Sequence, residues 1–349
     1  MRRPAAIDCF AGAGGLSLGL AMAGFRVASA FDADAQAVAT YVKNLGDHAR
    51  IARAEDVDVR TLLHDAKLAV GECALVAGGP PCQGFSVQRR GDDADVRNDL
   101  IFEFYRIVHE VQPLLFLMEN VSALGGRRGA PHLEELIVRA RRDGYQVQTR
   151  VLDAADFGVP QHRRRLFVVG ERTGTAPRFA FPEPTHGLGR YVTVRDAIFD
   201  LPAPRPVGKG EPCPIQNHEP DNISALNRER IAHVPQGGGR EHIPPELRLP
   251  CHRVSVDKAG HRNVYGRLHW DAPAGTITTR CNSFTRGKFA HPRDDRNISM
   301  REAARLQSFP DSFTFLGDKV ATAHQIGNAV PPLLAMSLGR SLLEVLRKS

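Results

Sequence analysis

Short apolar runs alternate with amphipathic segments along roughly the first 170 residues of the chain. The runs 74–77 and 114–118 are continuously apolar, which is typical of strands buried on both faces of a parallel sheet. The predicted strands are 5–10, 25–31, 74–77, 114–118 and 165–170, and the predicted helices are 16–23 and 100–111. This alternation predicts a doubly wound α/β domain with a mostly parallel sheet, whose ligands bind at the carboxyl ends of the strands.

The pattern changes after residue 172. Proline, glycine, histidine and basic residues become frequent between about 172 and 290, and the regular alternation fades. Helical patterns return at 301–307 and 332–347. The irregular stretch is therefore either a long insertion or a second domain that contacts substrate.

Composition adds little to this picture. The 349 residues carry a formal net charge of +7, which suits a polyanionic partner but does not establish one. The six cysteines include no C-x-x-C pair, which favours reduced thiols in a cytoplasmic enzyme over a disulfide framework or a zinc ribbon. Cys251-His252 matches no standard ligand spacing, so no metal is expected.

The N-terminus imitates a secretory signal, with Arg2-Arg3 before an apolar stretch and Ala28-Ser29-Ala30 after it. Asp8 interrupts the apolar stretch, and the glycines that follow suit a turn better than a signal helix. We therefore expect no signal peptide. No apolar run is long enough to predict a membrane span.

A glycine-rich turn, residues 8–15, links the first predicted strand to the first helix. Glycines let a backbone approach a ligand closely, but Ser17 stands where a dinucleotide-binding motif would have its third glycine. Asp32 ends the second strand, where it can accept hydrogen bonds from ribose hydroxyls, and Asp56 can accept one from an adenine amino group. The set predicts a nucleoside cofactor without a pyrophosphate, such as S-adenosylmethionine.

Cys82 follows two glycines and two prolines on a loop after the strand 74–77. A buried structural cysteine is a common alternative, but no apolar neighbours follow Cys82 and the loop lies at the ligand edge of the sheet. An ordinary thiol has a pKa of about 8.5, so a nucleophilic role requires a site that favours the thiolate.

Two further motifs carry charge at this edge. Glu119 ends the strand 114–118, where a carboxyl group can donate a proton to a ring nitrogen; a solvated strand-end glutamate is the alternative. Arg163, Arg164 and Arg165 open the strand 165–170. In an extended segment Arg163 and Arg165 share one face and could hold a phosphate or a carbonyl oxygen, unless the run is a plain basic surface.

Together these motifs resemble the cytosine-C5 DNA methyltransferase family, of the bacterial restriction-modification type. They occur in the family's order, and the resemblance covers most of the chain outside 172–285. Arg97-Asn98 before Leu100, the segment 301–311 and the segment 325–332 also fit. Any one of these motifs can arise by chance, but the ordered series is very specific for the family. The resemblance implies the fold of S-adenosylmethionine-dependent methyltransferases.

The resemblance also implies roles. Cys82 adds to C6 of cytosine, Glu119 holds and protonates N3, Arg165 lies near O2 of the base, and Arg163 supports the loop. Attack on C6 requires that the base be flipped out of the duplex. The residues implied to line S-adenosylmethionine are Phe10, Gly12, Gly14, Asp32, Asp56, Val57, Pro81, Leu100 and Asn328.

The family pattern divides the chain into a catalytic and cofactor-binding domain (1–178), a target-recognition domain (179–288) and a C-terminal segment that returns to the catalytic domain (289–349). Residues 276–279 resemble a threonine-containing motif near the end of the recognition domain. The candidates for contacts to bases or phosphates are Arg240, Arg248, Arg253, Arg262, Arg267 and Arg280. The expected partner is double-stranded DNA, with a cognate restriction endonuclease acting separately and the enzyme itself a monomer.

Three positions depart from the family. Asp32 replaces the usual glutamate, Glu55 precedes Asp56 where glycine is usual, and Cys9 replaces leucine in a position expected to be core. Three other functions compete: a transfer-RNA cytosine methyltransferase, an amino-group methyltransferase, and a non-catalytic DNA-binding regulator. The intact Cys82 and Glu119 favour catalysis on a cytosine ring.

Overall fold

The computed structural model describes residues 3–81, 100–172, 178–204, 215–250 and 263–347. The chain divides into two compact units. The sheet unit comprises Met1–Phe157, Arg164–Thr185 and Ala329–Ser349, and the irregular unit comprises Gly158–Arg163 and His186–Asn328. Residues 289–328, which were predicted to belong to the C-terminal segment, thus lie in the irregular unit, while the last helix lies in the sheet unit.

A seven-stranded sheet forms the centre of the sheet unit, in the order β3-β2-β1-β4-β5-β7-β6. The strands are β1 (Ala5–Cys9), β2 (Arg26–Asp32), β3 (Ala49–Ile51), β4 (Leu75–Gly78), β5 (Leu115–Val121), β6 (Tyr145–Asp153) and β7 (Arg164–Arg172). Only β7 of these runs against its neighbours, since it is antiparallel to both β5 and β6. The expected doubly wound, mostly parallel α/β fold is confirmed, although no residue range was predicted for β3, and β6 was not predicted.

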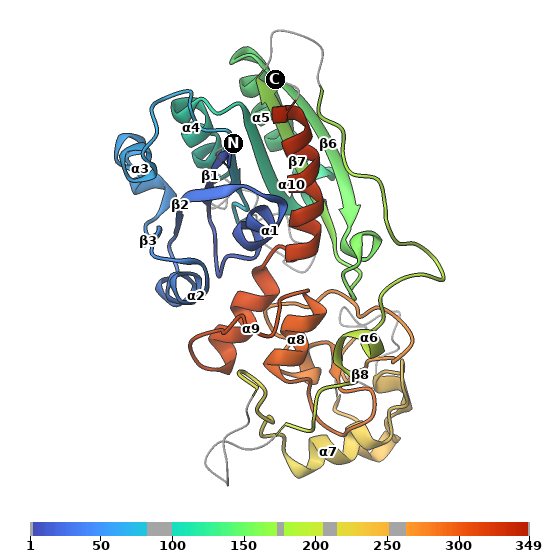
Figure 1. Cartoon of the computed structure of the whole chain (residues 1–349). Helices are drawn as coiled ribbons and strands as arrows, with labels where there is room; N and C mark the ends of the chain where they lie inside the picture. Colours follow the sequence, from blue (N-terminus) through green and yellow to red (C-terminus); the bar gives the residue numbers. More distant parts are fainter. Residues whose placement is uncertain (1–2, 82–99, 173–177, 205–214, 251–262, 348–349) are drawn as a thin grey trace. The chain divides into compact units, whose positions relative to one another are not determined.

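Helices cover both faces of this sheet (Figure 1). They are α1 (Gly15–Ala23), α2 (Ala35–Leu45), α3 (Val59–Ala66), α4 (Leu100–Val111), α5 (Ala130–Arg142) and α10 (Pro332–Arg347). Ile7 and Cys9 of β1 pack into the core formed with α3, α4 and α5, while Asp8 between them points to the opposite face. Cys9 is fully buried, as expected.

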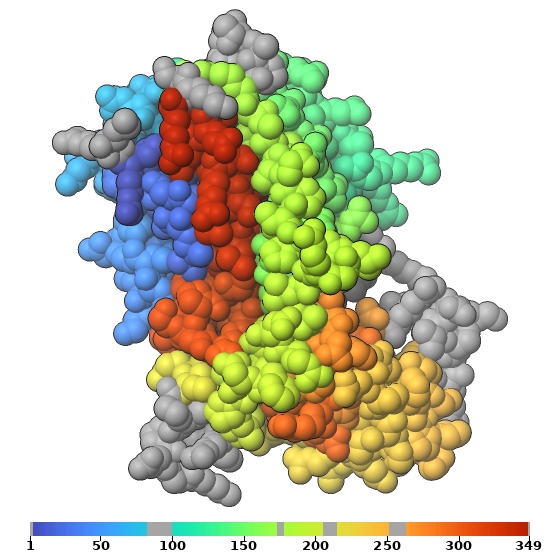
Figure 2. Space-filling model, turned by 45° about the vertical axis from the view of Figure 1, so that its right-hand side comes forward, coloured from blue at the N-terminus to red at the C-terminus, as the bar shows by residue number. Residues whose placement is uncertain are grey.

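The helices α1 and α10 pack against each other through small residues. A Cβ atom on Gly19 would lie 2.4 Å from the Ala335 Cβ, and one on Gly339 would lie 2.7 Å from the Ala23 Cβ. Side chains at either glycine would separate the helices. The surface of α10 is seen in red in Figure 2.

One segment, Lys319–Arg347, is by length and composition long and apolar enough to cross a membrane. No apolar run of that length was predicted from the sequence. However, 61% of its most apolar window is buried inside the protein, which is typical of a core helix.

The irregular unit contains short elements joined by long connections. Its helices are α6 (Val194–Ile198), α7 (Ala225–Ala232), α8 (Met300–Leu306) and α9 (Lys319–Asn328), and its strands are β8 (Gly266–Arg267) and β9 (Lys288–Ala290). With so few sheet and helix hydrogen bonds, its buried carbonyl groups need other donors.

Candidate active site

Four neighbouring strands bring most of the candidate residues to one edge of the sheet. The strands β2, β1, β4 and β5 are adjacent and parallel, so their carboxyl ends lie at the same edge. Phe10, Asp32 and Pro81 lie at or just beyond those ends, and Glu119 lies two residues before the end of β5. The sequence alone placed each of these residues at the end of a strand, and the strand order now brings them together.

The glycine-rich turn after β1 is held by backbone hydrogen bonds and by Asp32. Gly12 donates its N–H to the Asp32 carboxylate at 2.8 Å, and Phe10 and Gly12 both have positive φ, of 57° and 54°. A Cβ atom on Gly12 would meet nothing within 4 Å, so the backbone faces open space there. On Gly14 it would lie 2.5 Å from the Leu45 side chain, and its φ is 97°. Gly12 therefore borders open space, and Gly14 lies on the packed side of the turn.

Asp32 uses each carboxylate oxygen once, accepting from Gly12 N and from Asp34 N, both at 2.8 Å. Burial raises the pKa of Asp32, while these two N–H donors act in the opposite direction. A carboxylate has about four acceptor positions, so lone pairs remain for ribose hydroxyls. The shorter side chain at this position thus anchors the turn and keeps acceptor capacity.

Beneath the turn, a chain of hydrogen bonds starts at the buried Asp8. Ser17 donates its hydroxyl to Asp8 at 2.6 Å, Tyr41 donates to Ser17 at 2.9 Å, and Tyr41 lies 3.0 Å from His48 Nε2. Burial raises the pKa of Asp8 to about 7. The second oxygen of Asp8, Oδ1, is buried with no hydrogen-bond partner among the described residues. From the sequence, Asp8 was placed in the glycine-rich turn 8–15 but was given no role of its own.

Glu119 and Arg165 form an ion pair at the end of β5, with Arg165 Nε 3.0 Å from Glu119 Oε1. Both side chains are largely buried, at 11% and 16% exposure. The nitrogen lies within ion-pair distance of Oε1, but the geometry does not meet the requirements of a hydrogen bond. The antiparallel register pairs Val121 with Arg165, which puts Arg165 on the same face as Glu119 two residues away.

The loop after β4 is fastened next to this pair. Asn120 donates its side-chain amide to the Pro80 carbonyl at 3.0 Å. A Cβ atom on Gly79 would lie 3.3 Å from Glu119 Oε2, and one on Gly78 would lie 2.5 Å from the Cys9 carbonyl oxygen. The chain is therefore held close to Glu119 as it leads toward residue 82. Cys82 itself, like Arg97 and Asn98, lies outside the described residues.

Arg163, which the resemblance implies supports the loop, lies just before the strand that carries Arg165. β7 begins at Arg164, and Arg163 precedes it in the irregular unit, where it is 2% exposed. Its guanidinium donates to the carbonyl oxygens of Ile277 at 3.0 Å and Gly327 at 2.9 Å. Arg163 therefore joins the segment around Ile277 to the C-terminal end of α9.

Two glutamines that sequence analysis did not single out complete this arrangement. Gln161 donates to Gln307 Oε1 at 2.8 Å and accepts from the Ile277 N–H at 2.7 Å, and Gln307 donates to the Ile326 carbonyl. A Cβ atom on Gly327 would lie 2.2 Å from the backbone nitrogen of Thr279. The threonine-containing segment 276–279 is thus fixed by contacts to the backbone of Ile277 and Thr279, while Thr276 and Thr278 remain exposed.

The other cofactor candidates lie on three different elements. Asp56 is exposed at the end of the 3₁₀ turn η1 (Ala54–Asp56), Val57 after it is buried, and Leu100 begins α4. Asn328 ends α9 in the irregular unit, where its exposed side chain lies 3.3 Å from His324 Nδ1. In the part of the chain that the structure describes, no group of three His, Cys, Asp or Glu residues could hold a metal ion.

Burial separates the candidate arginines for DNA contacts. Arg267 is 4% exposed and Arg240 is 3% exposed, so neither is presented to a ligand in the folded unit. Arg248 donates to the Ile243 carbonyl at 2.6 Å and the Glu241 carbonyl at 2.9 Å. Arg280 follows the threonine segment and is exposed. Arg253 and Arg262 lie outside the described residues.

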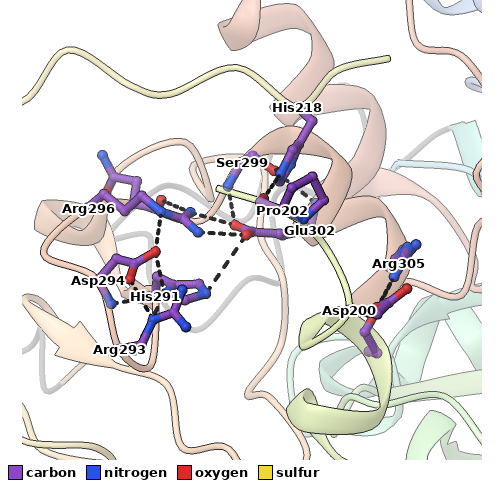
Figure 3. Close-up of polar contacts among 12 residues, drawn as sticks. Asp200, Pro202, His218, His291, Arg293, Asp294, Arg296, Ser299, Glu302 and Arg305 are labelled. Carbon is purple, nitrogen blue, oxygen red and sulfur yellow. Dashed lines mark hydrogen bonds and ion pairs between the residues drawn. The ribbon is translucent and has the colours of Figure 1, made fainter. Parts of the chain in front are cut away.

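A buried polar network supports α8 in the irregular unit (Figure 3). Glu302 accepts two hydrogen bonds from Arg296, each at 2.8 Å, and one from the Ser299 N–H at 2.7 Å. His291 lies 3.9 Å from Glu302, and burial lowers its pKa to about 4. His218 contacts Ser299 Oγ at 2.7 Å. The network fixes the start of the helix that carries Gln307 just beyond its end.

Comparison with known proteins agrees with this geometry. The family model of C-5 cytosine-specific DNA methylases matches residues 5–344. Type II methyltransferase M1.HphI of Haemophilus parahaemolyticus is 39% identical over 97% of this chain and 86% of its own length. Type II methyltransferase M.XorII of Xanthomonas oryzae pv. oryzae is 36% identical over 100% of this chain and 86% of its own length.

Solved structures give the same picture. A DNA modification methyltransferase encoded within an E. coli prophage superposes with a TM-score of 0.77 at 27% identity, covering 99% of both chains. The Dnmt2 methyltransferase of S. pombe, with a TM-score of 0.60 at 16% identity over 99% of both chains, shares the fold. Because the family model spans nearly the whole chain, this protein belongs to the C-5 cytosine-specific DNA methylase family and is a DNA cytosine-5-methyltransferase.

Proposed function

We propose that this chain transfers the methyl group of S-adenosylmethionine to C5 of a cytosine that is flipped out of a specific short sequence of duplex DNA. The observation that carries the proposal is the Glu119–Arg165 ion pair, fastened beside the loop that leads into Cys82. The pair sits at the same sheet edge as the glycine-rich turn, so base and cofactor sites would adjoin.

In this reaction the Cys82 thiolate adds to C6 of cytosine, while Glu119 donates a proton to N3. The addition makes C5 nucleophilic, and S-adenosylmethionine supplies the methyl group that C5 receives. Loss of the C5 proton to water and return of the N3 proton to the Glu119 carboxylate then restore the aromatic ring and expel the Cys82 thiolate. Arg165 orients Glu119 and lies near O2 of the base. Arg163 acts indirectly, by joining the segment around Ile277 to the end of α9.

The residues present fit the cofactor. Gly12 borders open space, and Asp32 keeps acceptor capacity after anchoring the turn. A backbone that approaches the ligand and an acidic group for ribose hydroxyls are what a nucleoside requires. The residues we propose to hold it are Phe10, Gly12, Gly14, Asp32, Asp56, Val57, Pro81, Leu100 and Asn328.

The proposed setting is that of a type II restriction-modification methyltransferase, because the relatives described above carry that name. A cognate endonuclease would then act separately on the same sequence, and we propose a monomeric enzyme that reads its target through residues 179–288. Flipping a base costs a few kcal/mol, which contacts to DNA phosphates from this basic chain would offset.

The experiment is bisulfite sequencing of genomic DNA from a methylation-free bacterial host that expresses the chain. A second culture that expresses the Cys82→Ala variant is sequenced for comparison. We expect 5-methylcytosine in one short sequence context with the wild type and none with the variant. Binding of S-adenosylmethionine by both proteins controls for folding. Methylation of transfer RNA but not of duplex DNA by the cofactor-binding wild type would overturn the proposal.

A further inference from the structure

We propose that Arg106 is a positioning residue for the cofactor, because its guanidinium holds the turn 54–57 in the shape that binds the adenine end. The inference rests on the proposed function, which assigns Asp56 and Val57 of this turn to S-adenosylmethionine. It concerns a residue of α4 that is not part of any of the motifs described above.

The turn itself has few internal constraints. It is a single 3₁₀ turn between β3 and α3, and its N-cap residue, Arg53, makes no side-chain capping bond. Its internal backbone bonds are Asp56 N–H to the Arg53 carbonyl at 3.0 Å and Val57 N–H to the Ala54 carbonyl at 3.3 Å. So short a turn has little intrinsic stability. Its shape must therefore come from what packs against it.

Arg106 supplies that contact from α4. Its Nη2 donates to the Ala54 carbonyl at 2.8 Å and lies 3.4 Å from the Val57 carbonyl. These two carbonyls bracket Asp56 on either side in the sequence. One planar donor group thus fixes both ends of the segment that presents the Asp56 carboxylate.

Two glutamates on the same helix orient the guanidinium. Arg106 Nε lies 2.8 Å from Glu103, and Nη1 lies 2.9 Å from Glu110, one turn before and one turn after it. With those two nitrogens engaged, Nη2 is directed at the turn. Charge-assisted hydrogen bonds on all three nitrogens give the group a single orientation, which a flexible lysine would lack.

The same helix joins two parts of the proposed cofactor site. Leu100 begins α4, and Leu100, Phe10 and Val57 all pack against the same hydrophobic core of the sheet unit. Arg106 lies on that helix less than two turns after Leu100. The helix therefore sets the position of Leu100 directly and the position of the turn 54–57 through Arg106.

The test is calorimetric binding of S-adenosylmethionine and of 5′-methylthioadenosine to the wild type and to Arg106→Ala. Both ligands carry the adenine, so we expect both dissociation constants to rise by about the same factor, about tenfold. In steady-state methylation, KM for S-adenosylmethionine should rise about tenfold, with kcat at saturating cofactor and KM for DNA nearly unchanged.

Arg139→Ala is the matched control. Arg139 also pairs with a glutamate on its own helix, Glu135 at 2.8 Å, and stacks over the Phe102 ring, but no contact reaches the turn 54–57. We expect its cofactor affinity to equal that of the wild type. Arg106→Lys, which can reach one carbonyl but not keep the guanidinium geometry, should fall between the wild type and Arg106→Ala.

Several outcomes would contradict the inference. Unchanged affinity for both ligands in Arg106→Ala, with normal affinity in the wild type, overturns the role of Arg106 and leaves the proposed function intact. Loss of S-adenosylmethionine binding but not of methylthioadenosine binding also overturns it. Failure of the wild type to bind S-adenosylmethionine overturns the proposed function instead.

If Arg106→Ala does not fold, the double variant Glu103→Gln/Glu110→Gln keeps the inference testable. That variant retains Arg106 but removes the charges that orient it. We expect a rise of about threefold in both dissociation constants, and no change in either would contradict the inference.

Discussion

The sheet unit and the irregular unit use their polar side chains in opposite ways. In the sheet unit the hydrogen bonds between strands satisfy the buried backbone, so charged groups near the strand ends, such as the Glu119–Arg165 pair, are not needed for that purpose. The irregular unit has few regular elements. There, buried arginines donate the hydrogen bonds that strand ladders would otherwise give to backbone carbonyls.

Arg267 and Arg301 show this second use most clearly. Arg301, fully buried, donates to three carbonyl oxygens at 2.8–3.1 Å. Arg267 contacts Asp295 and donates at 2.6–3.0 Å to the carbonyl oxygens of Ile231, Val234, His291 and Asp294. An excess of basic residues in an irregular segment therefore does not measure its DNA-binding surface, because a large share of the guanidinium groups can be internal.

The largest effect should come from Arg267→Ala. The substitution removes the guanidinium donor from four carbonyls and from the Asp295 carboxylate, and within the described residues only the carbonyls of Ile231 and Asp294 keep a backbone N–H donor as well. We expect the free energy of unfolding of the irregular unit to fall by about 5 kcal/mol. Urea unfolding followed by hydrogen exchange measures this. A stable Arg267→Ala protein with weakened DNA binding would show that Arg267 belongs to the recognition surface after all.

Next in size is the effect of Glu119→Gln on catalysis. Removing the proton donor while keeping the shape should lower the single-turnover rate of methyl transfer by about 10³-fold, with folding unchanged. Glu135→Gln, on the surface of α5, is the matched control and should retain the wild-type rate. A rate for Glu119→Gln within about tenfold of the wild type would argue against Glu119 as the proton donor.

A smaller effect, in the sheet unit, should depend on pH. Burial raises the pKa of Asp8 from 3.8 to about 7, so folded Asp8 keeps its proton where unfolded Asp8 has lost it. The stabilising contribution is therefore full below about pH 4 and lost as pH rises to about 7. Asp8→Asn should gain about 2 kcal/mol relative to the wild type between pH 5 and pH 8.

Urea unfolding of the cofactor-free proteins at both pH values measures the gain. His291, whose pKa of about 4 has the opposite effect on stability, is common to both proteins and cancels in the difference. A difference in stability between wild type and Asp8→Asn that does not change with pH would show that Asp8 is ionised in the fold.

The smallest effect should be that of Arg280→Ala on DNA affinity. Arg280 is exposed next to the threonine segment, so its loss should weaken DNA binding by about threefold. The slope of log affinity against log salt concentration should fall by about one, the value for one phosphate contact. Arg248→Ala is the comparison, because the Arg248 guanidinium donates to two carbonyls. Arg248→Ala should lower the stability and leave the salt slope unaltered. A lower salt slope in Arg248→Ala, with an unchanged slope in Arg280→Ala, would show that Arg248 and not Arg280 contacts a phosphate.

The fold of the sheet unit could be predicted because its signals are local. The continuous apolar runs of β4 and β5 show burial on both faces, and the glycine-rich turn and the Pro80-Pro81 loop mark where strands end. β6 escaped prediction because its residues are mostly half-buried or exposed, so it lacks an apolar run. The antiparallel direction of β7 likewise depends on pairing with β5 and β6, which no local pattern specifies.

By itself, the sequence determined the class of the fold, the order of the motifs and the residues worth testing, because backbone preferences and buried strands leave local patterns. Only the tertiary structure decided which partner each charged side chain has. Arg163 and Arg165 are two residues apart, yet one binds the carbonyls of Ile277 and Gly327 and the other pairs with Glu119. A guanidinium is satisfied equally by a carbonyl, a carboxylate or a phosphate, so its role follows from which acceptors the fold brings within reach.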